Sequence, residues 1–527
     1  MALLCRSVTF IKDGNKNRLR EQDIHKIVDT FTRQIDTPRY ARMVPFDEIA
    51  DPKNDFNLNL PRYIDSTEPE DLQDIDAHLN GGIPERDLDA LSAYWQVLPG
   101  LRAALFEPLR PGYARLKLPL AEVKPAIFSH PEFTAFNQAA TQRFTDWREA
   151  TTPRLTAFDQ DAHPKALIET VAEDLLERFR KAPLLDAYDI YQHLMDYWAE
   201  TMQDDAYLIA ADGWVAKPTR IIETDKKGKT RDKGWTCDLI PKPLIVSRFF
   251  GEKQAALEHL QSNLDSVSAS LEELVNEHGG EEGILNDVST KADAQAAYRQ
   301  ALIGLWSIDD KLACDKYEML VIEADDKATL LRTLADHHYM TPLKSDKGSL
   351  TLKSVKARLT ATDDPSEQAI LFEYLQADKL RKKSFKEAED LLMPVASRYR
   401  TRLETRPVPE DLIDLDVAAR YLALLDEQTT LKAAVNEAEA TLDNLAYAQY
   451  PKLSEAEIKT LVVDDKWMTH LSAVSQGELD RVSQTLTRRI RELAERYAMP
   501  LPALTDEVAA LAARVEEHLK RMGAVWK

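Results

Sequence analysis

Glycine is scarce in this chain, which has 16 glycines among 527 residues, about 3% against a typical value of roughly 7%. Nucleotide-binding α/β folds place glycines in tight turns where the backbone must approach a phosphate or a ribose. The sequence also contains no Walker loop, no Gly-x-Ser-x-Gly and no Cys-x-x-Cys. The scarcity of glycine favours helices over a cofactor-binding sheet. The missing motifs argue against an ATPase, a serine hydrolase or a redox enzyme of the common kinds.

Cysteine and long apolar runs are scarce as well. Cys5, Cys237 and Cys314 fit no zinc or redox spacing. His337-His338 lies in or at the end of a predicted helix, where adjacent residues do not face each other, so a surface cluster is favoured over a metal site. No apolar run approaches the roughly 18 residues of a transmembrane helix, and residues 1–10 lack the basic start of a signal peptide. We expect a cytoplasmic protein with no metal and no membrane contact.

The charge is one-sided, because 89 acidic residues against 68 basic ones leave a formal net charge of −21. Non-specific binding to nucleic acid depends on lysines and arginines that neutralise phosphates. A chain this acidic should therefore not coat DNA by itself. A local basic patch could still touch DNA inside a complex in which a partner supplies positive charge.

One such patch lies on a predicted β-hairpin. Residues 207–210, 220–223 and 235–240 have the composition of strands, and residues 226–229 (Lys-Lys-Gly-Lys) have that of a connecting turn. The tip of the hairpin could lay ammonium groups along a phosphate backbone without reading bases, although a solvated turn is the commoner role. The candidate DNA-phosphate contacts are Lys226, Lys227, Lys229, Arg231 and Lys233. A second basic cluster, at 379–386, falls on a predicted helix and is a weaker candidate.

Most of the remaining chain has the 3.6-residue period of amphipathic helices. Helices are predicted over 14–35, 72–79, 84–98, 166–202, 414–448, 479–493 and 504–522, with a second short hairpin over 343–352. The apolar residues that share one face of the first helix are Ile24, Ile27, Val28, Phe31 and Ile35. The predicted fold class is mainly α with a minor β part.

The clearest periodic signal is a heptad seam of apolar residues spaced three, four, three, four and three apart. Its members are Leu257, Leu260, Leu264, Val267, Leu271 and Leu274. Gly279-Gly280 ends the run. A seam needs a partner, and a helix over 292–306 that returns antiparallel is the expected one, because a short loop favours adjacent packing.

The sequence offers no residues for methyl transfer to adenine. A methyltransferase that acts on the exocyclic amine of adenine needs a glycine-rich turn after a strand to bind S-adenosylmethionine. It also needs an Asn- or Asp-Pro-Pro-aromatic turn, in which the polar side chain and a carbonyl accept hydrogen bonds from the amine of the flipped base. The chain contains no Gly-x-Gly and no Pro-Pro. No catalytic residue is therefore predicted.

Two segments nevertheless resemble a known family. Residues 14–20 (Gly-Asn-Lys-Asn-Arg-Leu-Arg), running into 23–28, resemble the segment that follows the last strands of the methyltransferase domain in modification subunits of type I restriction–modification systems. Residues 54–64 (Asn-Asp-Phe-Asn-Leu-Asn-Leu-Pro-Arg-Tyr-Ile) resemble the family's Asn-rich motif shortly downstream. The polar residues of that motif, whose role the resemblance does not define, are Asn54, Asp55, Asn57 and Asn59. Residues 191–198 and 464–467 are similar to long-form members.

The resemblance implies a subunit that methylates adenine N6 in DNA, using S-adenosylmethionine and a specificity subunit, with a restriction subunit joining for cleavage. The family's cofactor turn and Asn-Pro-Pro-Phe motif lie before the region that resembles this chain, so none of its catalytic residues has a counterpart here. A truncation, a frameshifted start or a split gene would each produce this pattern. S-adenosylmethionine is expected for the complete family enzyme and not for this chain alone.

The resemblance and the periodic patterns together divide the chain into five expected segments. These are the end of an α/β methyltransferase domain (1–110), a helical region with a β-hairpin (111–250), a coiled-coil hairpin (251–306), a mixed α/β region (307–410) and a C-terminal helical region (411–527).

Two functions remain open from the sequence. One is a partial modification subunit whose partners are the specificity and restriction subunits. Its methyltransferase part would lie on another chain, and it would reach DNA through the complex. The other is a free-standing helical coiled-coil interaction protein that binds or modulates such a complex.

Overall fold

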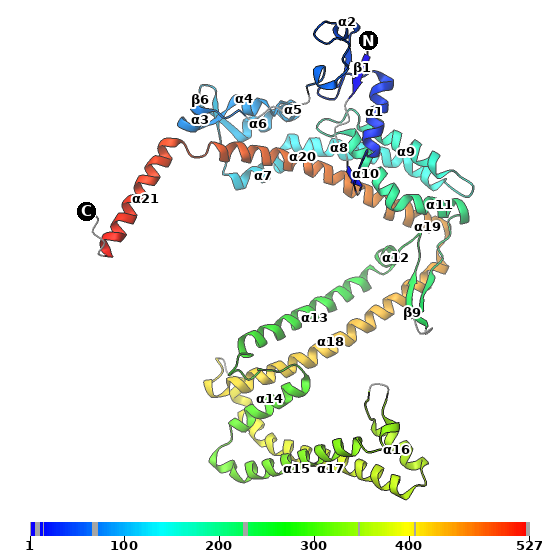
Figure 1. Cartoon of the computed structure of the whole chain (residues 1–527), viewed down its shortest axis with the longest axis vertical. Helices are drawn as coiled ribbons and strands as arrows, with labels where there is room; N and C mark the ends of the chain where they lie inside the picture. The colour runs from blue at the N-terminus through cyan, green and yellow to red at the C-terminus, as the bar shows by residue number, and fades with distance from the viewer. Residues whose placement is uncertain are drawn as a thin grey trace. The chain divides into compact units, whose positions relative to one another are not determined.

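The computed structural model describes residues 2–5, 11–13, 15–65, 72–224, 230–345, 348–404 and 407–522. Helices dominate these residues, and the strands form small antiparallel sheets of two or three strands (Figure 1). The predicted fold class, mainly α with a minor β part, is confirmed. The chain divides into two compact units, one made of Met1–Phe249 with Leu445–Lys527 and the other of Phe250–Asn444. The five-segment division stays a prediction.

The N-terminal part of the first unit is a thin layer of short strands around one helix. Strand β1 (Ala2–Cys5) pairs antiparallel with β4 (Ala41–Val44), with Ala2 opposite Val44. Strands β2 (Ile11–Asp13) and β3 (Lys16–Arg18) form a hairpin, and helix α1 (Glu21–Arg33) follows where the sequence turns periodic. The short helices α2 (Phe46–Ile49) and η1 (Leu60–Arg62) follow β4. A small core of Val44, Ile49, Tyr63 and Ile64 lies beneath them.

A three-stranded sheet follows, which the sequence pattern did not predict. Its strand order is β5 (Ile83–Pro84), β7 (Tyr113–Leu116) and β6 (Phe106–Arg110), all antiparallel. The predicted helices over 72–79 and 84–98 are present as shorter pieces. The helices around this sheet are α3 (Ile75–Asn80), α4 (Glu85–Asp89), α5 (Ser92–Val97) and α6 (Pro99–Leu105).

A helical body forms the rest of the first unit. The first three of its helices are α7 (Leu120–Ser129), α8 (Pro131–Thr156) and α9 (Pro164–Phe179). The next are α10 (Ala187–Tyr197), the π-helical η2 (Trp198–Met202) and α11 (Gln203–Asp212). The last of the body are α19 (Glu455–Lys459), the π-helical η7 (Thr460–Met468) and α20 (Thr469–Arg496).

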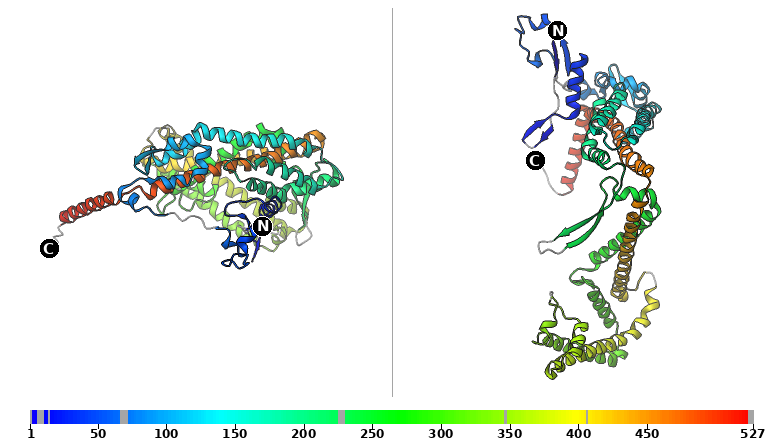
Figure 2. Two further views of the ribbon diagram at one scale, coloured as in Figure 1. Left: turned by 90° about the horizontal axis from the view of Figure 1, so that it is seen from above. Right: turned by 90° about the vertical axis from the view of Figure 1, so that its right-hand side faces the viewer.

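Helix α20 contacts α7, α8 and α10, and it runs beside α8 in both views of Figure 2. Its predicted apolar face is buried, since Leu486, Ile490 and Leu493 are at most 1% exposed. The predicted burial of the apolar residues around 191–202 is confirmed as well, with Leu194 fully buried.

The predicted strand over 207–210 is wrong, because these residues lie in α11. Ala206 and Ile209 are fully buried three residues apart while Tyr207 is 55% exposed, which is a helical period and not an alternating one. The chain enters this helix from α10 through the π-helical turn, so the β-like composition of the segment is overridden by its packing.

The predicted hairpin is present, but its second strand is shifted. Strand β8 (Thr219–Thr224) pairs with β9 (Thr230–Thr236), with Thr219 opposite Thr236. The expected strand over 235–240 ends at 236, because Cys237, Leu239 and Ile240 turn into the core, where each is less than 5% exposed. Helix α12 (Lys242–Phe249) then closes the segment.

The second unit is built on two long helices, α13 (Gly251–His278) and α18 (Ile413–Gln449), the latter continuing past the unit boundary. Its other helices are α14 (Lys291–Gly304), α15 (Lys311–Ala335), α16 (Leu352–Ala361) and α17 (Pro365–Leu403). Single 3₁₀ turns occur at η3 (Ile308–Asp310), η4 (Thr341–Leu343), η5 (Glu410–Leu412) and, in the first unit, η6 (Tyr450–Lys452).

The heptad seam has a different partner from the expected one. Val267, Leu271 and Leu274 pack in one cluster with Val417 and Tyr421 of α18. The pairing is antiparallel, since Gln261 donates to Glu439 at 3.1 Å while Gln428 donates to Ser268 at 2.9 Å. The predicted return helix contributes Ala294 to this cluster, but its Leu302 packs with Leu392 and Val395 of α17. The short-loop argument fails because α18 also brings apolar side chains to this cluster, among them Leu424, Leu425 and Leu431.

The predicted hairpin over 343–352 is also wrong in the part that the structure describes. Residue 343 ends η4 and residue 352 begins α16, and no strand lies between them among the described residues. Ser345 donates its backbone N–H to the carbonyl of Ser349 at 2.9 Å, which closes a tight loop. The Thr351 side chain then caps α16 by accepting from Ser354 N at 3.1 Å. The proposed turn residues 346 and 347 lie outside the described residues.

Candidate interaction surfaces

Helix α1 meets the helical body through polar side chains. Gln22, Asp29 and Thr30 are each less than 9% exposed, although their side chains are polar. The amide of Gln22 donates to Asp189 at 3.3 Å, and its backbone N–H donates to Gln192 at 2.9 Å. Both acceptors lie on α10, so this side of α1 is held by hydrogen bonds and not by apolar packing.

Ion pairs complete the same contact. Asp29 accepts from the Arg180 guanidinium and from the Tyr188 hydroxyl, each at 2.7 Å. Burial by itself would raise the pKa of Asp29, but these two hydrogen bonds and the nearby arginine charges bring that pKa below its usual value. Burial and the hydrogen bond to Asp29 raise the pKa of Tyr188 to about 12, so its hydroxyl remains a donor at neutral pH. Lys26 pairs with Asp186 at 3.1 Å, and His25 contacts Glu173.

The opposite side of α1 is apolar and open. Ile24, Val28 and Phe31 are spaced four and three residues apart, and they are 44%, 56% and 70% exposed. The prediction that these residues share one helical face agrees with this spacing. We call Ile24, Val28 and Phe31 the α1 apolar face.

The Asn-rich motif forms a loop that is held by hydrogen bonds among its own residues and to nearby ones. Asn54 donates its side-chain amide to the carbonyl of Glu48 at 2.8 Å, and the Asn57 side chain accepts from the backbone N–H of Asn59 at 2.9 Å. Tyr63 donates its hydroxyl to the carbonyl of Asn57 at 2.8 Å. Asp55 has a φ of 45°, a left-handed value that Asp and Asn tolerate better than most residues. In this structure the motif shapes the loop, and no contact described here gives it a catalytic role.

The candidate DNA-contact residues are only partly described. Lys226, Lys227 and Lys229 lie outside the described residues. Lys233 pairs with Glu223 at 2.9 Å, and Arg231 lies opposite Glu223 in the strand register. The described part of the hairpin thus mixes both charge signs, and its contact with DNA stays a prediction.

The remaining clusters from the sequence are surface features. On α17, Asp378 pairs with Lys382 at 2.8 Å and with Arg381 at 3.5 Å, which partly neutralises the second basic cluster. His337 and His338 follow α15 with ring centroids 4.3 Å apart. In the part of the chain that the structure describes, no group of three or more histidines, cysteines and acidic residues could hold a metal ion.

The two long-form segments meet around one buried carboxylate that sequence reasoning missed. Asp205 on α11 is 3% exposed; it pairs with Lys466 Nζ at 2.7 Å and accepts from Trp467 Nε1 at 2.8 Å. Burial raises the pKa of Asp205 while the Lys466 ammonium opposes that rise. Tyr197 donates to the carbonyl of Lys466 at 3.2 Å, which links residues 191–198 with 464–467. Helix α11 carries Asp204, Asp205 and Asp212, so the sequence offered no signal that singled out Asp205.

Besides Asp205, the residues of 464–467 contact three further parts of the first unit. Asp464 pairs with Arg148 on α8 at 3.1 Å, and Asp465 pairs with Arg248 on α12 at 2.6 Å. Lys466 also donates to the carbonyl of Leu239, just after the β8–β9 hairpin, at 2.9 Å. The segment lies in the π-helical turn η7, a geometry that often marks special sites in helices. Here its contacts connect α8, α11, α12 and the chain that follows β9. We therefore interpret its role as structural.

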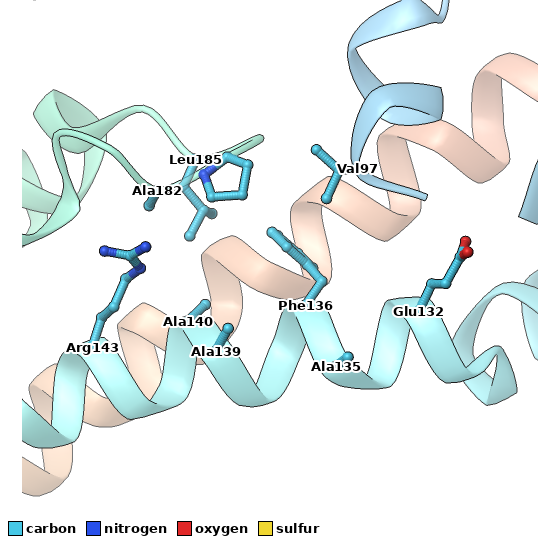
Figure 3. A pocket seen from close by; sticks show the side chains of 10 residues that line it. Val97, Glu132, Ala135, Phe136, Ala139, Ala140, Arg143, Ala182 and Leu185 are labelled. Atoms are coloured by element: carbon cyan, nitrogen blue, oxygen red, sulfur yellow. The ribbon is translucent and has the colours of Figure 1, made fainter. Parts of the chain in front are cut away.

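A hollow of about 330 Å³ lies along α8 (Figure 3). Its wall is apolar, with Val97, Phe136 and Leu185 around a floor of alanines. Its two charged groups already have partners. Glu132 accepts from the backbone N–H of Gly100 at 2.8 Å, and Arg143 donates to the carbonyl of Arg178 at 3.3 Å. The hollow offers apolar contact and no acid–base pair.

Helix α21 (Leu501–Arg521) is open to solvent along its length. The predicted apolar positions are exposed, with Val508 at 59% and Val515 at 56%. Helix α21 is therefore not a core element among the described residues.

The described residues do not fit S-adenosylmethionine. A nucleotide-binding turn follows a strand of a parallel sheet and is rich in glycine. The sheets described here are antiparallel throughout, and the glycines with positive φ are Gly81, Gly82, Gly112, Gly213, Gly234 and Gly348, which lie in short turns and loops. Among the described helices, none combines the length and apolarity that crossing a membrane requires.

Residues 5–72 match the N-6 DNA methylase family. The match covers α1, β4 and the Asn-rich loop, and it supports a function related to DNA methylation. No curated protein and no solved structure matches the chain.

Proposed function

We propose that this chain is the non-catalytic C-terminal part of the modification subunit of a type I restriction–modification system. It would act with a specificity subunit in S-adenosylmethionine-dependent methylation of adenine N6 in DNA. The observation that carries the proposal is the N-6 DNA methylase match at residues 5–72 in a chain that has no Gly-x-Gly and no Pro-Pro. The matched region contributes a helix, short strands and a loop, while cofactor and catalytic groups come from the methyltransferase domain.

The exposed helices suit the partners that this function requires. Helix α21 presents an apolar stripe to solvent, which suits pairing with helices of a specificity subunit. The basic tip of the β8–β9 hairpin would meet DNA phosphates within the complex, and a restriction subunit would join for cleavage. Cytoplasmic location follows from this function.

The test is methyl transfer from labelled S-adenosylmethionine to DNA. We expect no incorporation by the chain alone or by the specificity subunit with it. We expect incorporation when the chain, a specificity subunit and the methyltransferase domain of an N-6 DNA methylase are combined, and a lower rate when the chain is left out. Methylation by the chain alone would refute the non-catalytic role, and an equal rate without the chain would refute the subunit role.

A free-standing interaction protein is the second candidate, and the largely exposed apolar stripe of α21 is the observation that favours it. The two candidates differ in their genomic context. A reading frame upstream of Met1 that encodes a glycine-rich turn and Asn-Pro-Pro-Phe supports the modification subunit, whereas an unrelated gene and a promoter support the second candidate.

A further inference from the structure

Helix α21 carries an apolar seam with the spacing of a coiled coil. The members of the seam lie four, three and four residues apart, which are the steps between successive a and d positions. Their side chains are between 42% and 59% exposed among the described residues. The helix has 21 residues, about three heptads, so it is long enough for several layers of a helix pair. We call these residues the α21 seam: Leu504, Val508, Leu511 and Val515.

One flank of the α21 seam carries two opposite charges. Glu507 and Arg514 each directly precede a valine of the seam, so they occupy the same heptad position, seven residues apart. Glu516 pairs with Lys520 at 3.0 Å within the helix. Within the described part of the chain, neither Glu507 nor Arg514 has such an ion pair. Both charges are therefore available to a facing helix.

The α21 seam is complementary to a reversed copy of itself. When two identical helices are related by a two-fold axis and run antiparallel, residues at equal distances from a common midpoint face each other. A midpoint between Val508 and Leu511 places these two residues opposite each other on the two copies. The same register places Leu504 opposite Val515, so all four residues of the seam gain an apolar partner.

The flanking charges select the antiparallel arrangement. Reversal about a two-fold axis brings the same flank of both helices together, so Glu507 lies beside Arg514 of the second copy, and this pair occurs twice. A parallel pair would instead bring this flank against the other one, where positions 505 and 512 hold a threonine and an alanine. The parallel arrangement therefore gains no ion pair from these charges.

We propose that the α21 seam is the interface through which two copies of this chain pair antiparallel. The second copy is the occupant because it supplies both the apolar layers and the opposite charges. This inference goes beyond the proposed function, in which the same stripe would meet helices of a specificity subunit. Two paired chains would hold the stripe closed to that subunit until they separate.

The first test is sedimentation equilibrium of the full chain from about 1 μM to about 100 μM, the range of weak association. We expect a reversible dimer. Val508→Asp and Leu511→Asp should each raise the dissociation constant by about 30-fold or more, because a charge replaces an apolar residue in the centre of the interface. Unfolding midpoints measured at a concentration where the chain is monomeric should equal that of wild type, since both side chains are exposed.

A charge exchange tests the orientation. Glu507→Arg and Arg514→Glu should each raise the dissociation constant by about tenfold, because two attractions become two repulsions. A mixture of these two variants, with one of them fluorescently labelled, should pair as tightly as wild type, since every arginine then faces a glutamate. The matched control is Glu516→Arg, the same change of charge away from the seam, which should leave the dissociation constant unchanged.

Three results would overturn the inference. The first is a chain that stays monomeric over the whole series, including one that binds a purified specificity subunit through the α21 seam, which would make that subunit the occupant. The second is a dimer that survives both aspartate substitutions, which would place the interface on another surface. The third is a mixture of the charge variants that pairs no more tightly than either variant alone, which would exclude the antiparallel register.

Discussion

Two buried carboxylates, Asp29 and Asp205, connect helices of the first unit that are far apart in sequence. Asp29 lies between α1 and the arginine and tyrosine of the helical body, and Asp205 joins α11 to η7. Removing one member of such a pair leaves the other buried without compensation, which costs more than losing a surface contact.

Lys466→Met should destabilise the protein by about 3 kcal/mol or more, because it leaves the Asp205 carboxylate buried without its ammonium partner. The loss is measured by urea unfolding followed by circular dichroism. The control is Lys520→Met, which breaks the exposed pair with Glu516 at 3.0 Å and should leave the midpoint unchanged. Equal midpoints for the two variants would show that the Asp205–Lys466 pair contributes no more to stability than an exposed ion pair.

Acid should loosen the attachment of α1. The pKa of Asp29 is lowered on folding from its ordinary 3.8, so its contribution to stability is complete above that pH and is lost as the pH falls through the lower folded value. Amides of α1 should therefore lose protection against exchange near pH 3 compared with pH 5, after correction for intrinsic rates. In Asp29→Asn this difference should shrink, because the neutral amide does not titrate. A pH response that is the same in the variant would assign it to other groups.

At the scale of single elements, the same apolar period leads to two different outcomes. The seam of α13 is buried against α18, whereas the stripes of α1 and α21 face solvent. The spacing of apolar residues is similar in all three helices, so the period by itself cannot tell a helix with a partner in the chain from one without.

Leu271→Ala should destabilise the α13–α18 pair by about 2–5 kcal/mol, because Leu271 is 7% exposed and its loss leaves a cavity. Faster hydrogen exchange of amides in α13 and in the facing part of α18 measures this effect. Glu273→Ala, at an exposed position of the same helix, serves as the control and should change little. Unchanged protection of α13 in Leu271→Ala would mean that the seam is not what holds the pair.

At the scale of the whole molecule, charge sets the expected behaviour toward nucleic acid. A net charge of −21 opposes the phosphate backbone, while the hairpin tip is locally basic. We expect the chain alone to bind a random DNA duplex more weakly than about 10⁻⁴ M at physiological salt, the weak end of ordinary non-specific binding. Fluorescence anisotropy over a salt series measures this.

Micromolar binding in that assay would contradict the whole-molecule argument. If replacement of Lys226, Lys227 and Lys229 by Glu then abolished it, the local basic tip would outweigh the overall charge. The matched control is the same number of Lys→Glu changes on α17, at Lys379, Lys383 and Lys386.

The sequence by itself indicated several of the helices and which of their residues share a face. A period of 3.6 residues predicted the apolar face of α20 and the burial around Leu194, and strand composition predicted the strand at 220–223. Both signals are local properties of the sequence. The resemblance at 14–64 likewise depended on contiguous residues, and the methylase match at 5–72 agrees with it at the family level.

Only the tertiary structure decided what each apolar face contacts. It placed α18 against the seam of α13, put 207–210 in a helix, and buried Asp205 beside Lys466. It also showed that α1 turns its polar side inward. Partner choice depends on packing between residues that are hundreds of positions apart, and a local period carries no information about them. The scarcity of glycine was visible from the start, whereas the exposure of the α1 apolar face was visible only in three dimensions.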